Sequence, residues 1–386
     1  MAKPRRLLTV GHSYVVALNR RLAHEMAVAG RGEWDVTVAA PKFMHGDLRP
    51  IALERYANEA CRLVEVGAHF SKRIHTMVYG LGLRRLLREP WDLVHCWEEP
   101  FVLSGAQSGF WAGQAPVVYY TFQNIDKRYP FPFSAIERWC GRRCAGWLAA
   151  AKTVEEVVAN RPGGYADKPH RMIPLGVDLD VFRPDTAAKA AVLTKLNWSL
   201  VGPPVIGMLG RFVPEKGIEM LQRALAGLET PWRAMFVGGG VMEPQLRAWA
   251  ETQGDRVRIV TGVKHDEVPA YLNGMEVLVA PSQTTPRWRE QLGRMLLEAF
   301  ACGVPVIGSD SGEIPHVVGD AGLILPEADD AAWTDGIARL LESSKLREEF
   351  AQRGLERART EFAWPIIARR HLAFFDELLA GRGGSS

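Results

Sequence analysis

The chain has 386 residues, of which 47% are hydrophobic and 24% charged, with a formal net charge of +3. This length fits two domains of about 150 to 200 residues, and the composition excludes a disordered or fibrous protein. Basic residues are concentrated in residues 1–175, where 24 Lys and Arg accompany 16 Asp and Glu, against 23 and 28 in the remainder.

Targeting and redox features point to the cytoplasm. No apolar run approaches the about 18 residues needed to cross a bilayer, and the first residues lack the length and cleavage site of a secretory signal. The five cysteines are an odd number and widely scattered, which indicates reduced thiols. Cys140 and Cys144 lie one helical turn apart without nearby His or Cys partners, so a zinc site is not expected.

The predicted elements alternate along the chain. Amphipathic helical segments separate short apolar runs bounded by Gly, Pro or Asp, and this order favours parallel sheets covered by helices on both faces. The runs are "RLLTVG", "WDVTVAAP", "WDLVHCW", "APVVYYTF", "PPVIGMLG", "WRAMFVGGG", "VRIVTG", "MEVLVAPS" and "VPVIGSD".

A basic segment, residues 71–90, interleaves Lys and Arg with Met, Val and Leu. This pattern suits a helix that lies on an anionic membrane surface. A solvated helix packed on a sheet is the alternative. Peripheral association with the inner face of the membrane is therefore a hypothesis.

Pro174, Gly176 and Pro184 interrupt the series before a new strand begins. We place the domain boundary there, with Rossmann-like domains at 1–175 and 176–363. Doubly wound domains bind ligands at the carboxyl ends of their strands, so a cleft between the two domains is the expected site.

Two cations follow the first strand of the second half. In "GMLGRFVPEKGIEML", Gly210 ends the strand, and Arg211 and Lys216 lie on the loop before a helix. They could neutralise a diphosphate, Arg211 by a bidentate fork and Lys216 as a point charge. Ordinary surface residues are the alternative.

Two glutamates, Glu290 and Glu298, are eight positions apart around Gly293. One unbroken helix would not stack them, so we expect Glu290 on a loop and Glu298 on the second turn of a helix that starts between them. Amides around Leu292 and Gly293 would then attract a phosphate. The two carboxylates would then hold the two ends of one ligand. The alternative is that both are ordinary solvated glutamates on the surface.

The last predicted helix, residues 364–380, carries a row of apolar side chains that need a surface to bury against. We expect it to pack on the N-terminal domain. Residues 381–386, "GRGGSS", are expected to form a disordered tail.

These motifs together resemble glycosyltransferase family four, retaining enzymes of the GT-B fold that use nucleotide-sugar donors. The resemblance covers nearly the whole second half, in order and with similar spacings, and the glutamate pair looks like the E-x7-E signature of that family. The matching pieces are "IPLGVDLDVFRP", "GRFVPEKG", "FVGGG" and "VLVAPSQTTPRWREQLGRMLLEAFACGVPVIGSDSGEIPHVVGDAGLILP".

The resemblance implies roles in the second half. Arg211 and Lys216 would contact the donor diphosphate, Glu298 the ribose, and Glu290 the hydroxyls of the transferred sugar. Further donor contacts are implied for Gly210, Gly239, the backbone of Val263 near the nucleobase, and the amides of Leu292 and Gly293.

The first half departs from the family. Its first loop reads Gly11, His12 and Ser13 where relatives more often have paired glycines. Gly11 and His12 are candidates for donor contact. The alternative is that His12 is an ordinary loop residue or lies at the start of a helix, with Ser13 as the N-cap.

Acceptor-side candidates lie at the ends of two other predicted strands. Gln123 and Asn124 occupy the position where many relatives carry a histidine, and they can bind hydroxyls but not act as acid or base. His95, Glu98 and Glu99 could orient an acceptor hydroxyl, although for His95 a buried, hydrogen-bonded histidine is the favoured account.

The predicted function is retaining transfer of a hexose-type sugar from a nucleoside diphosphate, such as UDP or GDP, to a glycan or lipid-linked acceptor in cell-surface polysaccharide or glycolipid synthesis. The resemblance implies a front-face route in which the leaving diphosphate accepts the acceptor's proton, without metal or cofactor. The alternatives are an epimerase, a phosphorylase or a non-catalytic sugar-nucleotide-binding assembly protein. Neither a nucleic-acid partner nor a nicotinamide dehydrogenase is expected, the latter because no G-x-G-x-x-G follows a strand.

Overall fold

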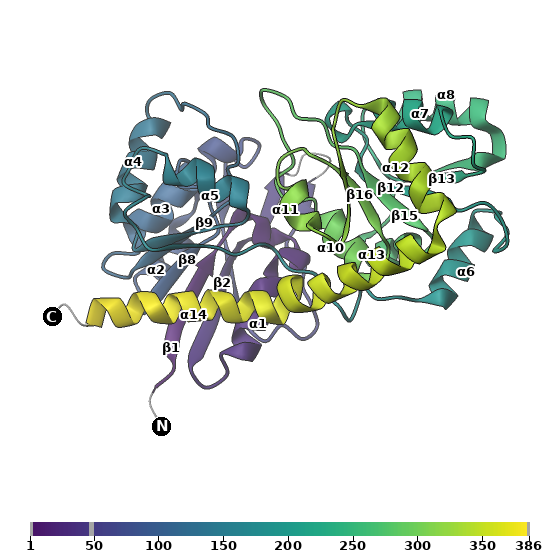
Figure 1. Cartoon of the computed structure of the whole chain (residues 1–386). Coiled ribbons are helices and arrows are strands. Elements are labelled where there is room, and N and C mark those ends of the chain that lie inside the picture. The colour runs from purple at the N-terminus through teal and green to yellow at the C-terminus, as the bar shows by residue number, and fades with distance from the viewer. Residues whose placement is uncertain (1–2, 46–49, 384–386) are drawn as a thin grey trace. The chain divides into compact units, whose positions relative to one another are not determined.

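The computed structural model describes residues 3–45 and 50–383 and divides into two compact units (Figure 1). Unit 1 contains Met1–Pro174 and Trp364–Ser386, and unit 2 contains Leu175–Ala363. The expected boundary after residue 175 differs from this division by one residue. The residues after 363, predicted as a helix on the N-terminal domain, belong to unit 1.

Unit 1 is built on a seven-stranded parallel sheet of order β11-β10-β9-β8-β1-β2-β5. Its central strands are buried on both faces, which explains why they read as continuous apolar runs. The strands are β1 (Arg5–Val10), β2 (Trp34–Pro41), β5 (Arg62–Val66), β8 (Leu93–Cys96), β9 (Val117–Thr121), β10 (Gly146–Ala149) and β11 (His170–Met172). Two short antiparallel pairs are β3 (Phe43–His45) with β4 (Pro50–Ala52), and β6 (Ala68–His69) with β7 (Val78–Tyr79).

Helices cover this sheet, and α14 packs against α1 (Figure 1). The buried face of α14 includes Ile367 and Phe375, which belong to the apolar row seen in the sequence, and also His371. The helices of unit 1 are α1 (Arg21–Ala29), α2 (Leu81–Leu87), α3 (Leu103–Trp111), α4 (Phe133–Arg143), α5 (Lys152–Ala159) and α14 (Trp364–Gly383), with short 3-10 turns η1 (His12–Val15), η2 (Ala17–Arg20) and η3 (Ile74–Thr76).

Two predictions for unit 1 need correction. The helix α14 continues to Gly383, three residues into the expected disordered tail, because an existing helix gains a hydrogen bond with each added residue; residues 384–386 lie outside the described residues. The basic segment 71–90 is not one helix, since its helical part is α2 alone. Leu83, Leu86 and Leu87 of α2 enter the core while Arg84 and Arg85 are exposed, as expected of a helix packed on a sheet.

Unit 2 has a six-stranded parallel sheet of order β14-β13-β12-β15-β16-β17. The strands are β12 (Val205–Arg211), β13 (Arg233–Gly239), β14 (Val257–Val260), β15 (Val277–Ala280), β16 (Val306–Ser309) and β17 (Gly322–Leu325). The helices are α6 (Thr186–Lys195), α7 (Ile218–Ala226), α8 (Glu243–Gln253), α9 (Val268–Asn273), α10 (Arg294–Ala301), α11 (Ile314–Val318), α12 (Asp330–Glu342) and α13 (Ser344–Arg357). Short turns η4 (Pro214–Lys216), η5 (Gly254–Arg256) and η6 (His265–Glu267) and a π-helical turn, η7 (Ala358–Phe362), complete it.

All five cysteines are free and buried. Burial raises the pKa of the Cys140 thiol to about 12 and that of Cys144 to about 11, so both stay protonated at neutral pH. They pack as small apolar side chains.

Candidate functional site

Each sheet has a topological switch point, where the strand order reverses beside the first strand of the unit. In unit 1 it lies between β1 and β8, and in unit 2 between β12 and β15. Parallel sheets bind ligands outside the carboxyl ends of their strands at such points. The loops after these four strands are therefore where the predicted residues should gather.

Lys216 and Glu290 meet at the switch point of unit 2. Lys216 ends η4 in the loop after β12, and Glu290 lies on the loop after β15, as predicted. The Lys216 Nζ forms an ion pair with Glu290 Oε2, and the Ser282 hydroxyl donates to the same oxygen at 3.0 Å. Lys216 Nζ also lies 5.3 Å from the Trp288 ring centroid. Because the two charged side chains are only 12% and 10% exposed, water screens the pair weakly.

A close backbone approach fixes the Glu290 loop. The Glu313 amide donates to the Glu290 carbonyl at 3.1 Å, and Gly312 has a φ of +58° directly beside it. A Cβ at Gly312 would lie 2.1 Å from the Glu290 carbonyl oxygen, so the loop can pass there only over glycine. Sequence reasoning missed both Gly312 and Ser282, since a glycine in a turn and a serine after a strand are ordinary features.

The helix α10 begins between the two glutamates, as predicted. Gly293, at a φ of +73°, is its N-cap and has no side chain to cap the amides of the first turn. Such a turn keeps donors available for an anion. Glu298 is buried on the second turn of α10, whereas Glu290 lies on the loop before this helix.

His265 is a further residue of this region. Its Nε2 lies 3.2 Å from Glu298 Oε1, and its ring contacts Phe182 edge-on at 5.4 Å. The side chain is 41% exposed, so it can reach a ligand. The loop that carries it was predicted near the nucleobase through Val263, which is half-buried, but the histidine itself was overlooked.

Arg211, Gly210 and Gly239 lie together at the ends of β12 and β13, where Arg211 and Gly239 are register partners. A Cβ added at Gly210 or Gly239 would meet nothing within 4 Å, so open space adjoins both positions. Within residues 3–45 and 50–383, the exposed Arg211 guanidinium makes no hydrogen bond or ion pair. Both properties suit close approach of an anionic ligand.

The switch point of unit 1 joins His12 to Glu98. Glu98 Oε1 accepts hydrogen bonds from the His12 amide at 2.7 Å and the Tyr79 hydroxyl at 2.5 Å. Its Oε2 lies 2.7 Å from His12 Nδ1 and accepts from the Ser104 hydroxyl at 3.0 Å. Burial by itself lowers the pKa of His12, but the adjacent Glu98 carboxylate outweighs it and raises that pKa above the usual 6.5. Gly11 precedes η1 with Trp97 and Tyr14 packed around it.

The remaining acceptor-side candidates surround a second buried carboxyl, Glu99. It accepts hydrogen bonds from the Thr121 hydroxyl and the Phe122 amide, and burial raises its pKa to about 7. Gln123 is half-buried and donates to the Ile125 carbonyl, while Asn124 is almost fully buried. Gln123 is thus the more accessible of the two amides.

His95 is not an acceptor-side residue. Its side chain is fully buried, its Nδ1 lies 2.9 Å from the Thr9 hydroxyl, and its ring packs against Tyr120, His371 and Phe375. Side chains alternate between the two faces of a sheet, and that of His95 on β8 points to the face that α14 covers. It does not point to the edge where the strands end and a ligand would bind. Burial and the neighbouring His371 lower its pKa well below 6.5, and it stays neutral.

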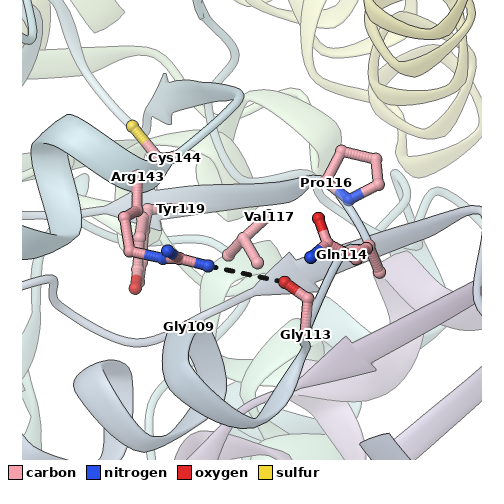
Figure 2. A pocket seen from close by; sticks show the side chains of 9 residues that line it. Gly109, Gly113, Gln114, Pro116, Val117, Tyr119, Arg143 and Cys144 are labelled. Atoms are coloured by element: carbon pink, nitrogen blue, oxygen red, sulfur yellow. Dashed lines mark hydrogen bonds between the residues drawn. The ribbon is translucent and has the colours of Figure 1, made fainter. Parts of the chain in front are cut away.

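Two hollows in unit 1 lie away from these residues. One, of about 220 Å³, is at the start of β9, where Arg143 points toward the Gly113 carbonyl at 3.5 Å (Figure 2). It contains none of the predicted site residues. The other is an apolar groove of about 560 Å³ between α3 and α4, lined among others by Leu103, Phe110 and Trp139.

Among the described helices, none combines the length and the apolar character that a bilayer crossing requires. The same residues contain no group of three or more His, Cys, Asp or Glu side chains placed to hold a metal ion. Metal independence stays a prediction.

Two family models match the chain in succession. Residues 15–181 match the family described as Glycosyltransferase Family 4, and residues 198–357 match Glycosyl transferases group 1. Over 219 residues the chain is 34% identical to a GDP-mannose-dependent alpha-(1-6)-phosphatidylinositol monomannoside mannosyltransferase of Mycolicibacterium smegmatis, covering 54% of this chain and 56% of the relative. The chain thus spans about half the length of the first curated relatives it matches.

Longer alignments extend the similarity to both units. The lipopolysaccharide core biosynthesis mannosyltransferase LpsB of Rhizobium meliloti is 26% identical, with 89% of this chain and 98% of the relative covered. Sucrose-phosphate synthase from Thermosynechococcus elongatus has the same fold, with a TM-score of 0.73 at 20% identity over 98% of this chain and 100% of the other. Both Rossmann-like sheets and the fold similarity confirm the predicted α/β class, GT-B. The two family-model matches, the relatives and the fold similarity confirm the resemblance to glycosyltransferase family four.

Proposed function

We propose that the chain transfers a hexose from a nucleoside diphosphate sugar to a glycan or lipid-linked hydroxyl, with retention at the anomeric carbon and without a metal ion. The observation that carries the proposal is the cluster of Lys216, Glu290 and Ser282 at the switch point of unit 2. It places a fixed cation beside a carboxylate at the position where doubly wound sheets bind nucleotides.

Charge stabilisation by the protein is the core of the proposed mechanism. As the bond between sugar and diphosphate breaks, negative charge grows on the diphosphate, and Lys216, Arg211 and the first turn of α10 would stabilise it. Glu290, released from Lys216 by the incoming diphosphate, would accept hydrogen bonds from sugar hydroxyls. Glu298 would hold the ribose, with His265 fixing its carboxylate.

GDP-mannose is the donor we favour. Two relatives support it, since one is named as GDP-mannose-dependent and the other as a mannosyltransferase. Thermal shift with UDP, GDP, ADP and their sugars tests the donor, because a ligand that binds the folded state selectively raises the melting temperature. A rise with GDP and GDP-mannose alone is expected; a selective rise with UDP or ADP sugars would reject the base assignment.

Retention and metal independence need separate measurements. Nuclear magnetic resonance of the product should give the same anomeric configuration as the donor. Transfer should also persist in a chelator, since protein cations supply the charge that a divalent ion supplies elsewhere. Activity that a chelator abolishes and manganese restores would reject the metal-independent mechanism.

A lipid-linked acceptor and peripheral membrane contact are part of the proposal. The apolar groove between α3 and α4 supports it, together with the exposed Phe110 on its rim. Exposed arginines lie on α4 and on α2, which packs against α3: Arg84, Arg85, Arg138, Arg142 and Arg143. Apolar side chains beside cations suit an anionic lipid surface.

Co-sedimentation with vesicles of anionic phospholipid tests the membrane contact. We expect binding that weakens with salt and with the double change Arg84→Glu and Arg85→Glu, while neutral vesicles bind less. Lys345→Glu, a reversal of a surface charge on α13 in unit 2, is the matched control and should bind like the unchanged protein. Binding insensitive to salt and to the arginine reversals would contradict this part.

A further inference from the structure

A hollow of about 570 Å³ lies at the amino ends of three neighbouring strands of unit 2. The residues around it precede or begin β12, β13 and β14. β12 and β13 have seven residues each, so each spans about 20 Å at about 3.3 Å per residue, and they end at Arg211 and Gly239. The hollow therefore lies at the opposite edge of the sheet from the proposed nucleotide site.

Arg233, the first residue of β13, is a buried cation in the wall of this hollow. It is 7% exposed and, within the described part of the chain, forms no ion pair. Its Nε donates to the Pro203 carbonyl and its Nη1 to the Ser199 carbonyl, both at 2.8 Å. The Glu276 carboxylate influences this charge but is bonded elsewhere, since it pairs with Lys189 and accepts from a backbone amide. Burial lowers the pKa of Arg233, so its charge is incompletely compensated.

The guanidinium has donors to spare. An arginine carries five N–H donors, and the described residues of the chain use two of those on Arg233. The donors that remain belong to Nη1 and Nη2. Buried polar groups in proteins are nearly always hydrogen-bonded, and a buried charge is costly without a partner. Unused donors and an unpaired charge therefore point to an anion that binds in the hollow.

The approach to this guanidinium is open on the side of Gly202. On another side, the Trp198 ring centroid lies 5.2 Å from the guanidinium carbon. A Cβ added at Gly202 would lie 3.3 Å from Nη1 and 3.5 Å from Nη2 of Arg233, so a side chain there would cover the charge. Gly202 is exposed and is not among the residues with a positive φ, so its backbone does not require glycine. The absence of a side chain leaves the guanidinium accessible.

The rest of the lining decides what kind of anion fits. Pockets of about 300 to 1,000 Å³ with mostly apolar walls and a few polar groups are typical of small-molecule sites. Two exposed acids at the hollow, Glu229 and Asp255, disfavour a ligand with several negative charges. An apolar body with a single negative charge suits the walls better. The apolar side chains around the hollow are Trp198, Val201, Pro203, Leu228, Pro231 and Trp232.

We propose that this hollow binds a small carboxylate with an apolar body, such as an arylalkanoate. The carboxylate accepts hydrogen bonds from the free donors of Arg233, and the body of the ligand packs against the apolar walls. Binding is non-covalent, and the site is distinct from the residues that we assign to the nucleotide sugar. The proposal does not depend on the proposed function.

Gly202→Glu is the decisive variant. Replacing Arg233 itself would also release the Ser199 and Pro203 carbonyls and disturb the walls of the hollow. Gly202→Glu leaves those contacts in place and attaches a carboxylate next to the guanidinium, where it competes with the ligand. Gly202→Gln is the matched control, because its side chain has the same shape without the charge.

Binding is measured by saturation-transfer NMR titration with 3-phenylpropionate and its neutral analogue, 3-phenylpropionamide. The unchanged protein should bind the carboxylate at least about 10-fold more tightly than the amide, because a charged hydrogen bond distinguishes them. A nucleoside diphosphate should not displace the carboxylate. Gly202→Glu should bind it at least about 10-fold more weakly than Gly202→Gln does.

Thermal unfolding of the two variants tests Arg233 without any added ligand. Gly202→Glu should melt at a higher temperature than Gly202→Gln at pH 7, because the new carboxylate gains a cationic partner. The cation lowers the pKa of this carboxylate in the folded state, so the added stability is present above the ordinary pKa of about 4.3. It should be lost as the pH falls through the lower, folded-state value.

Four results would overturn the proposal. Absence of 3-phenylpropionate binding up to about 10 mM would show that the hollow is not a carboxylate site. Equal binding of the amide would show that it is only an apolar surface. Displacement by a nucleoside diphosphate, or equal binding by the two variants, would place the carboxylate elsewhere. Equal melting temperatures of the variants at pH 7 would show that Arg233 is not available to an anion.

Discussion

The two switch points each pair a cation with a carboxylate, but in different settings. In unit 2, Lys216 and Glu290 are both about nine-tenths buried and form an ion pair with each other. In unit 1, Glu98 is fully buried while the imidazole of His12 is partly exposed and can lose its charge. The charges of the unit 2 pair are shielded from solvent, whereas the charge of His12 can change with pH.

The largest effect we expect comes from the fixed charge. Lys216→Ala should lower the transfer rate by about 10³-fold, because it removes a cation directed at the developing charge and leaves the Glu290 carboxylate without its ion pair. Lys189→Ala is the control, since Lys189 pairs with Glu276 at 2.5 Å in the same unit but away from the switch point. Steady-state kinetics check this, and equal losses in both variants would remove Lys216 from the mechanism.

A difference in stability should follow the difference in burial. Glu98→Ala should lower the free energy of unfolding by about 3 kcal/mol, because it leaves several buried donors without an acceptor. Glu290→Ala should cost less, since Glu290 is closer to solvent. Calorimetry of the two variants measures this, and the reverse order would show that the unit 2 pair is the structural one.

The two glutamates of unit 2 should separate binding from turnover. Glu298→Gln should weaken nucleoside diphosphate binding about 10- to 100-fold, the loss of a charged hydrogen bond to ribose. Glu290→Gln should leave that binding unchanged and lower kcat. Titration calorimetry with the nucleotide measures binding, and steady-state kinetics measure turnover. Weaker nucleotide binding by Glu290→Gln would contradict the assignment of binding to Glu298 and turnover to Glu290.

The last expected effect concerns pH and two buried histidines of unit 1, His95 and His371. Burial lowers the pKa of His371 to about 4 and that of His95 well below 6.5, so the unfolded chain binds more protons between about pH 4 and 6.5. Stability therefore rises with pH across this window and is lost as pH falls. His371→Leu should flatten the slope by about 1.4 kcal/mol per pH unit, measured by urea denaturation. An unchanged slope would mean that His371 is already protonated in the fold.

The site of unit 2 could be predicted from the sequence because its residues lie on short loops between strong strand and helix signals. Glu290 on a loop, Gly293 at the helix start and Glu298 on the second turn all follow from local propensity and spacing. Ser282 and Gly312 could not be predicted, because their roles depend on loops that only the folded sheet brings together.

Unit 1 was harder to predict for the same reason. His12 contacts Glu98 from the loop after β8, 86 residues further along the chain. Glu98 is held in turn by Tyr79 of β7 and Ser104 of α3. In the sequence, His95 and Glu98 were equally plausible site residues. Because side chains alternate along β8, the His95 side chain points into the core. Glu98 follows the strand, and Ser104 of α3 holds its carboxylate by a hydrogen bond. No local pattern distinguishes the two outcomes.

The discontinuity of unit 1 has a consequence for synthesis. Its core includes Ile367, His371 and Phe375 of α14, whereas unit 2 is one contiguous stretch, Leu175–Ala363. On the ribosome, unit 2 can close its core as soon as its own residues have emerged, but unit 1, although made first, must wait for α14. Until then the aromatic layer around His95 and Tyr120 stays uncovered, and a chain that stalls before Trp364 exposes it to aggregation.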